Sequence, residues 1–378
     1  MPSLFITGYG IEQATLKTDD LVQRLTECAH DSLDDKPREV KLSAAIAPHI
    51  AREDRAMLTS QTICCLNVGF SAMNMAEKIV GFTPAEKEAM CVYTTYETVR
   101  DFHEMVWQFK TSSEQYAEKA LLLRSLGKIA NTVHPLRLFR KLPTNGLYHL
   151  SKLFGLRGGG YPLRKMSLGG MSLLEEAFYN LPCSDASGAL ICAYGDMLKA
   201  DNAQVFRKMG LIEPLDAHRS SVQGAEGAVS LVVETAERVS RQKTRPLAQV
   251  LLAFSRFSTS MFATTQDWIE AYAQLAPWVR ESNPVVVLYD NGAPGIGDAE
   301  ERALKGSLTA FEIRRYKPWS KYAVATSGLV DLVCALADPS IQPGRVVIIH
   351  GEGAGMGLGL IVLRKLGMAS VQSERAPS

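Results

Sequence analysis

The amino-acid sequence predicts a layered α/β fold in which helices cover buried strands. Apolar runs of strand length recur along the chain between Gly and polar turns, as is typical of strands covered on both faces. Stretches with helical periodicity alternate with these runs, which indicates helices packed on a sheet. With 378 residues, of which 46% are hydrophobic, the chain is long enough for a large core in two halves.

The expected elements follow in order along the chain. Residues 3–10 predict a first strand that ends in a glycine turn at Gly8 and Gly10. Apolar residues three and four positions apart predict helices over 54–77, 84–91, 113–130 and 171–181. Further apolar runs predict strands over 189–194, 229–234, 248–254, 285–289, 346–350 and 358–363. The basic, polar stretch 238–246 separates two strand-rich parts, so we divide the chain into halves 1–238 and 239–378.

Charge and cysteine content argue against several classes of function. The chain has 41 Lys and Arg against 40 Asp and Glu, so no strong field attracts nucleic acid or a membrane surface. No apolar run approaches the ~20 residues that span a bilayer. The N-terminus lacks the features of a signal peptide, so we expect a cytoplasmic protein. The seven cysteines show no metal-ligand spacing, so no metal is expected, and their odd number and mostly apolar surroundings predict reduced, buried thiols. No bound cofactor is expected either.

Ser167 is the residue from which a function is argued. It follows a glycine turn at 158–160 and a short extended run, and it opens the helix expected over 171–181. The partial positive charge of a helix N-terminus favours a thiolate nucleophile. It does much less for serine, whose hydroxyl proton must be removed by a nearby base. Serine is also a favoured N-cap, so a purely structural role stays open.

Several segments resemble, in chain order, the β-ketoacyl synthases of the thiolase superfamily. In the first half they are 5–10 (first strand), 134–146 (before the nucleophile), 154–158 (GLxGP, with Gly159 replacing proline) and 215–219 with 224–228 (FDxxRxG…EGA). In the second half they are 297–301 (GDxxE), 317–328 (KSxxGHxxGAAG) and 351–357 (the closing Gly-Phe-Gly-Gly turn). Together they extend over nearly the whole chain.

The resemblance implies a thiolase-like, five-layer αβαβα fold of two related halves, which dimerises through the half that carries the nucleophile. Active members hold an acyl group on cysteine and use two histidines to condense it with a malonyl group on a carrier protein. Here Ser167 matches the cysteine, Asp290 the first histidine and Tyr322 the second. An ionised Asp290 would repel the developing enolate, and Tyr322 cannot shuttle protons near neutral pH as imidazole does.

Residues that shape the framework of the family are retained. The resemblance implies an ion pair between Lys317 and Glu301, and it assigns Asp298 to the same motif as Glu301. It places fold-shaping turn residues at Asp216, Arg219, Glu226 and Gly227.

Retained framework with altered catalytic positions indicates a non-catalytic subunit. In type II polyketide systems that subunit is the chain-length factor, which pairs with an active ketosynthase and closes one end of its acyl tunnel. The resemblance therefore implies a heterodimer with an active β-ketoacyl synthase in fatty acid- or polyketide-type synthesis, with aryl-polyene synthesis as the narrower hypothesis. An acyl carrier protein is the second expected partner, and its phosphopantetheine-linked acyl chain is the indirect ligand. Chain-length factors often carry glutamine at the position of the cysteine. Ser167 of this sequence departs from that pattern.

Two other functions stay open at this stage. Some thiolase-fold acyltransferases use serine as nucleophile, so Ser167 could accept an acyl group if a base lies within ~3 Å of its hydroxyl. The histidines considered for that task are His134, His149, His218 and His350. A homodimeric scaffold unrelated to lipid or polyketide synthesis is the third hypothesis, because a fold does not determine a function.

Overall fold

A computed structural model describes residues 3–27, 40–79, 81–96, 142–208, 222–242, 245–279 and 283–367, with a few isolated residues between 114 and 140. The strands of this part are β1 (Leu4–Gln13), β2 (Leu16–Lys17), β3 (Cys91–Thr95), β4 (Pro162–Leu163), β5 (Gly188–Asp196), β6 (Glu226–Thr235), β7 (Ala248–Arg256), β8 (Val285–Val287), β9 (Glu312–Arg314), β10 (Val346–Gly353) and β11 (Gly357–Lys365). They form one hydrogen-bonded sheet of order β4-β3-β5-β6-β1-β7-β11-β10-β8-β9, and β2 pairs with β1.

Helices connect and cover the strands. They are α1 (Leu21–Glu27), α2 (Arg52–Arg55), α3 (Ser60–Ile79), α4 (Pro84–Glu88), α8 (Asn145–Phe154), α9 (Gly169–Asn180), α10 (Ala200–Lys208), α11 (Ala236–Gln242), α12 (Thr265–Ala273), α13 (Ala276–Val279), α14 (Ile296–Ser307), α15 (Lys317–Ser320) and α16 (Ser327–Ala337). Short 3₁₀ turns are η1 (Ala47–His49), η2 (Met166–Leu168), η3 (Leu181–Cys183) and η4 (Val324–Thr326).

The sheet consists of two groups of five strands with the same pairing pattern. From the centre outward, β1 pairs antiparallel with β6 and β6 antiparallel with β5, and β5, β3 and β4 then run parallel. The strands β7, β11, β10, β8 and β9 repeat this pattern. The groups join where β1 runs antiparallel to β7, with Leu4 opposite Val250 and Ile6 opposite Ala248. Such a repetition is what two related halves produce.

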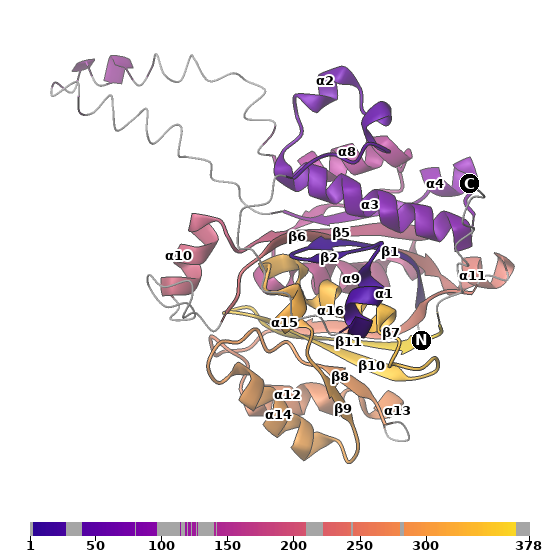
Figure 1. Ribbon diagram of the computed structural model, residues 1–378. Helices are drawn as coiled ribbons and strands as arrows, with labels where there is room; N and C mark the ends of the chain where they lie inside the picture. Colours follow the sequence, from indigo (N-terminus) through magenta and orange to yellow (C-terminus); the bar gives the residue numbers. More distant parts are fainter. Residues whose placement is uncertain are drawn as a thin grey trace.

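The helices give the molecule five layers (Figure 1). α3 and α8 cover the outer face of the first strand group. α9 and α16 form a middle layer between the two groups, and α12 and α14 cover the outer face of the second group. The order helix, sheet, helix, sheet, helix confirms the αβαβα fold that the sequence predicts.

Strand residues alternate between two hydrophobic cores, so the strands are buried on both faces as predicted. In β5, Ile191 and Ala193 belong to the core around the middle helical layer, whereas Leu190 belongs to the core under α3 and α8. In β10, Ile349 faces the middle layer and Ile348 faces α12 and α14. The period of two places successive side chains on opposite faces, and the helices on both sides bury every position of β5 and β10.

The glycine turn expected at the end of the first strand is wrong. β1 continues through Gly8 and Gly10 as far as Gln13. α3 crosses β1 at these glycines: a Cβ atom would lie 2.2 Å from the carbonyl oxygen of Ala72 at Gly8, and 2.0 Å from that of Val68 at Gly10. Both separations are too short for any side chain, so the glycines allow helix and strand to pack closely.

Three of the four predicted helices are present, with shifted ends. The pattern over 54–77 corresponds to α2 and α3, which residues 56–59 separate. α9 confirms the helix expected over 171–181, and most of the helix expected over 113–130 lies outside the described residues. No helix of the described ranges is long and apolar enough to cross a membrane.

A buried arginine connects α11 with the end of β6 and the start of α4. The sequence placed Arg238 in a polar connection, but it lies in α11 and is 2% exposed. Its Nε donates to Oε2 of the fully buried Glu234 at 2.5 Å, and a second guanidinium nitrogen pairs with Glu86. A third donates to the carbonyl oxygen of Gly81 at 2.9 Å, and the guanidinium carbon lies 4.5 Å from the ring centroid of Phe82. Burial raises the pKa of Glu234, and Arg238 opposes that shift.

We predict that Arg238→Ala lowers the free energy of unfolding by ~3–5 kcal/mol, because it leaves the Glu234 carboxylate buried without its charged partner. Arg241→Ala is the matched control. The ion pair of Arg241 with Glu237 is exposed, so its loss changes the free energy of unfolding by about 0.5 kcal/mol or less. Urea unfolding followed by circular dichroism measures both variants, and equal losses would contradict the structural role of Arg238.

Candidate functional site

Ser167 lies in a turn that leads into the N-terminus of α9. The turn contains Met166 at φ +47, a left-handed conformation that is rare for residues other than glycine. Val324 has φ +53 in the equivalent turn before α16. The two turns pack against each other, since a Cβ atom at Gly170 would lie 2.8 Å from the carbonyl oxygen of Ala325. Ser167 is therefore at the centre of the molecule, where it is 1% exposed.

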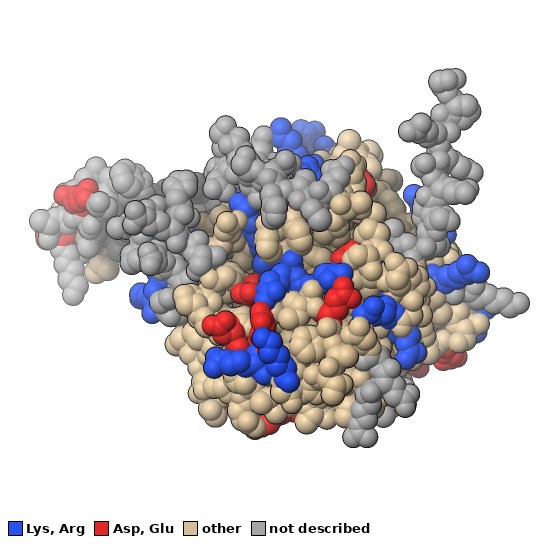
Figure 2. Space-filling view, turned by 60° about the horizontal axis from the view of Figure 1, so that its bottom comes forward, with Lys and Arg blue, Asp and Glu red and all other residues tan. Residues whose placement is uncertain are grey.

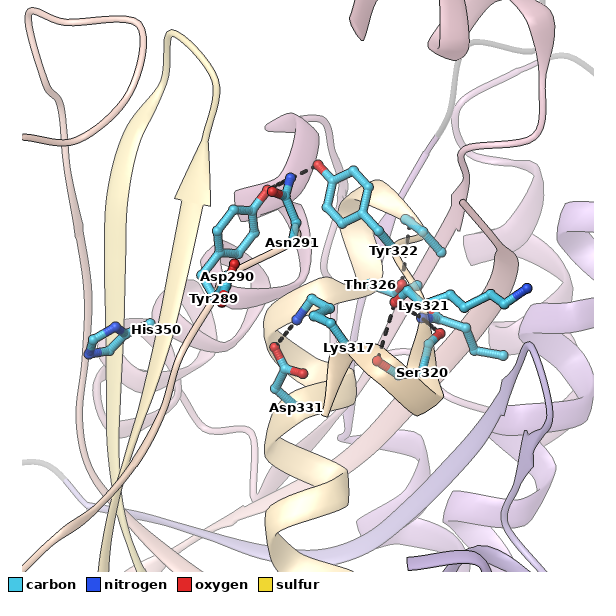
Figure 3. A network of polar contacts seen from close by, with 12 residues as sticks. Tyr289, Asp290, Asn291, Lys317, Ser320, Lys321, Tyr322, Thr326, Asp331 and His350 are labelled. Atoms are coloured by element: carbon cyan, nitrogen blue, oxygen red, sulfur yellow. Dashed lines mark hydrogen bonds and ion pairs between the residues drawn. The ribbon is translucent and has the colours of Figure 1, made fainter. Parts of the chain in front are cut away.

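The side chains around Ser167 form a chain of hydroxyl groups. The hydroxyl of Ser167 hydrogen-bonds that of Tyr322 in a short contact. The hydroxyl of Tyr289 donates to Tyr322 Oη at 3.1 Å, and Asn291 Nδ2 donates to Tyr289 Oη at 3.4 Å. Figure 3 shows Tyr289 and Asn291 pointing toward Tyr322. Tyr289, Asn291 and Tyr322 are between 1% and 5% exposed, so the chain is closed to solvent.

Burial decides the protonation state of this chain. It raises the pKa of Tyr289 well above its ordinary value of 10, and interaction with Tyr322 adds to the shift. Tyr289 is therefore a neutral hydrogen-bond donor near neutral pH. A neutral phenol cannot take the proton from the hydroxyl of Ser167, so it cannot act as a general base.

The segment that carries Tyr289 is fixed by the carboxylate of Glu300 in α14. The backbone N–H of Tyr289 donates to Glu300 Oε1 at 2.8 Å, and that of Asp290 donates to Oε2 at 2.9 Å. Glu300 is fully buried. The sequence analysis did not identify Glu300 and Tyr289 as site residues. Side chains alternate in direction along an extended segment, and this alternation would have placed Tyr289 and Asn291 on one face.

Asp290 does not lie among the hydroxyl groups, which corrects its expected place beside Ser167 and Tyr322. Its carboxylate points away and forms an ion pair with Arg315 at 3.2 Å. The side chain of Asp290 is 26% exposed, whereas its neighbour Tyr289 is 2% exposed. The reason is geometric: successive side chains of an extended segment point in opposite directions, so only one of the two neighbours can face the site.

The ion pair expected between Lys317 and Glu301 is wrong. Lys317 Nζ pairs with the fully buried Asp331 of α16. Burial raises the pKa of Asp331 to about 6, and Lys317 opposes that shift. Glu301 lies on the solvent side of α14 and pairs with Arg315 instead. Asp298 is exposed in the first turn of α14, where a carboxylate interacts favourably with the helix dipole.

Two further framework residues lie where β1, β5 and β6 meet. Glu226 begins β6 and accepts a hydrogen bond from the hydroxyl of Tyr194 at 2.7 Å, and burial raises its pKa. At Gly227 a Cβ atom would lie 2.5 Å from Cβ of Gln13, so glycine allows β1 and β6 to pair. Both residues support the sheet beside the site.

Among the histidines that the structure describes, none forms a hydrogen bond with Ser167. His149 is buried in α8 of the outer layer, and burial lowers its pKa. His350 hydrogen-bonds Glu300 at 2.6 Å through Nδ1, and its other ring nitrogen bonds the hydroxyl of Tyr272. Four predicted residues lie outside the described ranges: His134, Asp216, His218 and Arg219. In the described part, no group of three or more His, Cys, Asp or Glu has the geometry of a metal site.

Similar proteins are found among solved structures. No protein-family model and no curated protein matches the chain. A β-ketoacyl synthase from Burkholderia phymatum STM815 has a TM-score of 0.72 at 15% identity, over 97% of this chain and 100% of that chain. The ishigamide ketosynthase/chain length factor has a TM-score of 0.71 at 13% identity, over 97% and 100%. A third solved structure is the complex of a type II PKS acyl-carrier protein with its ketosynthase bound to the hexaketide. One chain of it has a TM-score of 0.71 at 14% identity, over 97% of this chain and 99% of that chain. The fold is therefore the thiolase-like fold of ketosynthases.

A second buried carboxyl lies beside the hydroxyl chain. Glu352 is the last residue but one of β10, is 1% exposed and accepts a hydrogen bond from the backbone N–H of Ala263 at 2.7 Å. Burial raises its pKa from an ordinary 4.5 to about 8, and the carboxylates of Glu300 and Asp267 add to the shift. A carboxyl whose pKa is raised on folding stabilises the folded state below its ordinary pKa, and this stabilisation is lost as pH rises through the folded-state value.

We predict that Glu352→Gln weakens the pH dependence of stability between pH 4.5 and pH 8, the two pKa values of Glu352. The amide oxygen of the introduced glutamine can still accept from the N–H of Ala263, so the folded state is retained. The free energy of unfolding of the variant should equal that of the native protein near pH 4.5. Above pH 8 it should be the larger of the two. Urea unfolding across this range is the measurement, and parallel curves for both proteins would refute the raised pKa.

Proposed function

We propose that this chain is a catalytically silent partner of an active β-ketoacyl synthase, with a role similar to that of a chain-length factor. The observation that carries the proposal is the hydrogen bond between Ser167 and Tyr322. The phenol of Tyr322 occupies the position where the family resemblance expects a histidine. The described hydrogen-bond partner of the serine hydroxyl is therefore a poor base. The similarity of the fold to ketosynthases and to a ketosynthase/chain length factor supports the same role.

The chemistry of both half-reactions argues for silence. Acyl transfer to Ser167 requires that its hydroxyl proton be removed as the thioester is attacked, and neutral Tyr289 cannot remove it. Decarboxylative condensation requires two donors that face the enolate oxygen. The hydroxyls of Tyr289 and Tyr322 are instead engaged with each other and with Ser167. This arrangement supports packing and hydrogen bonding at the site rather than condensation.

The charged edge of the sheet is unsuited to a partner strand. At the β9 edge, Arg314 pairs with Glu312 at 2.5 Å, and Arg345 pairs with the same carboxylate at 3.3 Å. Charged side chains protect an edge strand from further pairing. Figure 2 shows positive and negative side chains lying side by side on one face of the molecule rather than a patch of one sign.

The opposite edge, at β4, favours a partner. Tyr161 is 37% exposed directly before β4, and its ring packs edge-on against Tyr93 of β3 at 5.5 Å. Tyr179, near the end of α9, is 49% exposed. Exposed tyrosines are enriched at protein interfaces, because a large rigid ring contributes contact area at low entropic cost. We therefore place the ketosynthase at the β4 edge, in the half that carries Ser167.

The proposed role concerns the product of the partner. The growing acyl chain is held by the cysteine of the ketosynthase and supplied on the phosphopantetheine arm of an acyl carrier protein. Bulky side chains of this subunit at the shared interface then limit chain length, since a close-packed interior leaves no room for further units. A polyketide or aryl-polyene chain is the product class that fits this role.

Mass spectrometry of the intact subunits tests the proposal. The chain is incubated alone, and together with a ketosynthase partner, with acyl- and malonyl-carrier protein. We expect the ketosynthase to gain the acyl mass while this chain stays unmodified, because the described partners of its serine hydroxyl include no base. A Ser167→Ala variant of this chain should leave product formation by the pair unchanged.

The alternative function is a serine acyltransferase, and the same experiment detects it. An acyl mass on this chain that disappears in Ser167→Ala would make Ser167 a nucleophile and overturn the proposal. The acyl group would then be expected on the carrier or on a small acceptor after a chase.

The position of the partner gives a separate prediction. Tyr179→Asp should weaken association with the ketosynthase roughly fivefold or more, since loss of an interface tyrosine costs ~1–3 kcal/mol of binding free energy. Tyr148→Asp is the matched control, because Tyr148 on α8 is 52% exposed and lies in the outer layer. Analytical ultracentrifugation of the mixed subunits measures both. Equal affinities for the two variants would place the partner elsewhere.

A further inference from the structure

The geometry points to a built-in closure of the Ser167 site. Tyr322 and Tyr289 fill the space in front of the serine hydroxyl, and Glu300, held by His350, fixes the segment that carries Tyr289. The inference rests on the proposed function and deepens it, since a closed site keeps the acyl chain out of this subunit. Beyond Tyr322, which the family resemblance matches to a histidine, it assigns the closure to Tyr289, Glu300 and His350, for which the resemblance implies no role.

Apolar side chains surround the two phenol rings. The ring centroids of Phe206 and Tyr322 are 5.6 Å apart, and those of Tyr289 and Tyr322 are 6.1 Å apart, both in edge-on arrangements. Met197 and Val222 belong to the same buried cluster. Because protein interiors are packed as densely as organic crystals, any group that approaches Ser167 along this side must first displace Tyr322.

The direction of the Tyr289 side chain is set by its backbone. The carboxylate of Glu300 accepts from two successive N–H groups, one on each oxygen, at 2.8 and 2.9 Å. A bidentate contact of this kind fixes the orientation of the peptide as well as its distance. Tyr289 is thereby directed inward, and Asn291 donates to its hydroxyl from two residues further along.

The carboxylate is itself held by side chains from two other elements. His350 of β10 contacts Glu300 Oε1 at 2.6 Å, and the His350 ring stacks on Trp268 of α12 with centroids 4.5 Å apart. Tyr272 of α12 bonds the remaining ring nitrogen. Glu300, His350, Trp268 and Tyr272 are all at most 3% exposed. In so dry a network, loss of one partner leaves the others unsatisfied, so the position of Glu300 is strongly determined.

A carboxylate is required at position 300 for a chemical reason. Both oxygens of Glu300 face N–H donors, so the group must offer two acceptors. Glu300→Gln keeps the volume but turns one acceptor into an NH₂ donor, which faces another donor. The substitution should release the 289–290 segment while it leaves the core of α14 filled. Glu301→Gln, one residue along the same helix, alters only the partially exposed pairs with Arg315 and Lys305.

Reactivity of a thiol placed at Ser167 measures the closure in the full-length chain. In Ser167→Cys, we expect the new thiol to react with iodoacetamide at least about 100-fold more slowly than the exposed Cys183, because a buried group reacts only through local opening. Adding Tyr322→Ala or Glu300→Gln should raise its rate at least about tenfold, whereas adding Glu301→Gln should leave it unchanged. Peptide mass spectrometry follows each cysteine separately.

Cysteines already in the chain separate closure from general stability. Cys64, Cys192 and Cys334 are buried and should stay protected in every variant. A rise in rate that they share would overturn the inference, because Glu300 would then stabilise the whole fold rather than position Tyr289. Rapid alkylation in Ser167→Cys alone would equally refute the closure.

The outcome is independent of the partner experiment. If the site proves open while this chain still gains no acyl mass beside its ketosynthase, the closure fails and the silent role stands. If the site is closed in isolation but Ser167 is acylated in the complex, the proposed function fails and the closure becomes a gate that the partner opens.

Discussion

Burial of the middle helical layer is the constraint on which the rest of the structure depends. α9 and α16 lie between two strand groups, and every residue of α16 is buried. The first residues of both helices, 169–174 of α9 and 327–332 of α16, are buried, so the N–H groups at their N-termini lie in the interior, where the preceding turns have to satisfy them. The left-handed residues Met166 and Val324 make these turns, and the position of Ser167 follows from the first of them. The site is therefore a product of the way in which the two halves pack.

Burial also decides what the site can do. An imidazole in the interior can hold or release a proton near neutral pH, whereas a buried phenol stays protonated. With Tyr289 and Tyr322 beside it, Ser167 takes part in a neutral hydrogen-bond chain rather than a proton relay. The phenol of Tyr322 therefore forms hydrogen bonds at this site but does not relay a proton near neutral pH.

Buried carboxylates set the geometry around this centre. Glu300, Asp331 and Glu352 are at most 1% exposed, and each has a partner: backbone amides and His350, Lys317, and the amide of Ala263. Desolvation offsets much of the attraction in such contacts, so their net effect on the free energy of unfolding is small. Their directional hydrogen bonds fix which way neighbouring segments face. The inward direction of Tyr289 depends on one of them.

The layered fold was predictable because it follows from local pattern. The mainly apolar runs at 189–194 and 346–350 correspond to β5 and β10, whose faces are both buried because helices cover both sides of the sheet. Gly8 and Gly10 were misread because a glycine that admits a crossing helix looks in sequence like one that makes a turn. The helix that crosses there, α3, is far away in the chain.

By itself, the sequence determined the fold class, the place of Ser167 before a helix and the absence of histidine at the matching positions. Only the tertiary structure decided that Tyr289 rather than Asp290 faces Ser167, and that Lys317 pairs with Asp331 rather than Glu301. The physical reason is the same in both cases. Neighbouring residues in an extended segment or a helix differ in direction, and contacts with distant elements decide which of them faces inward.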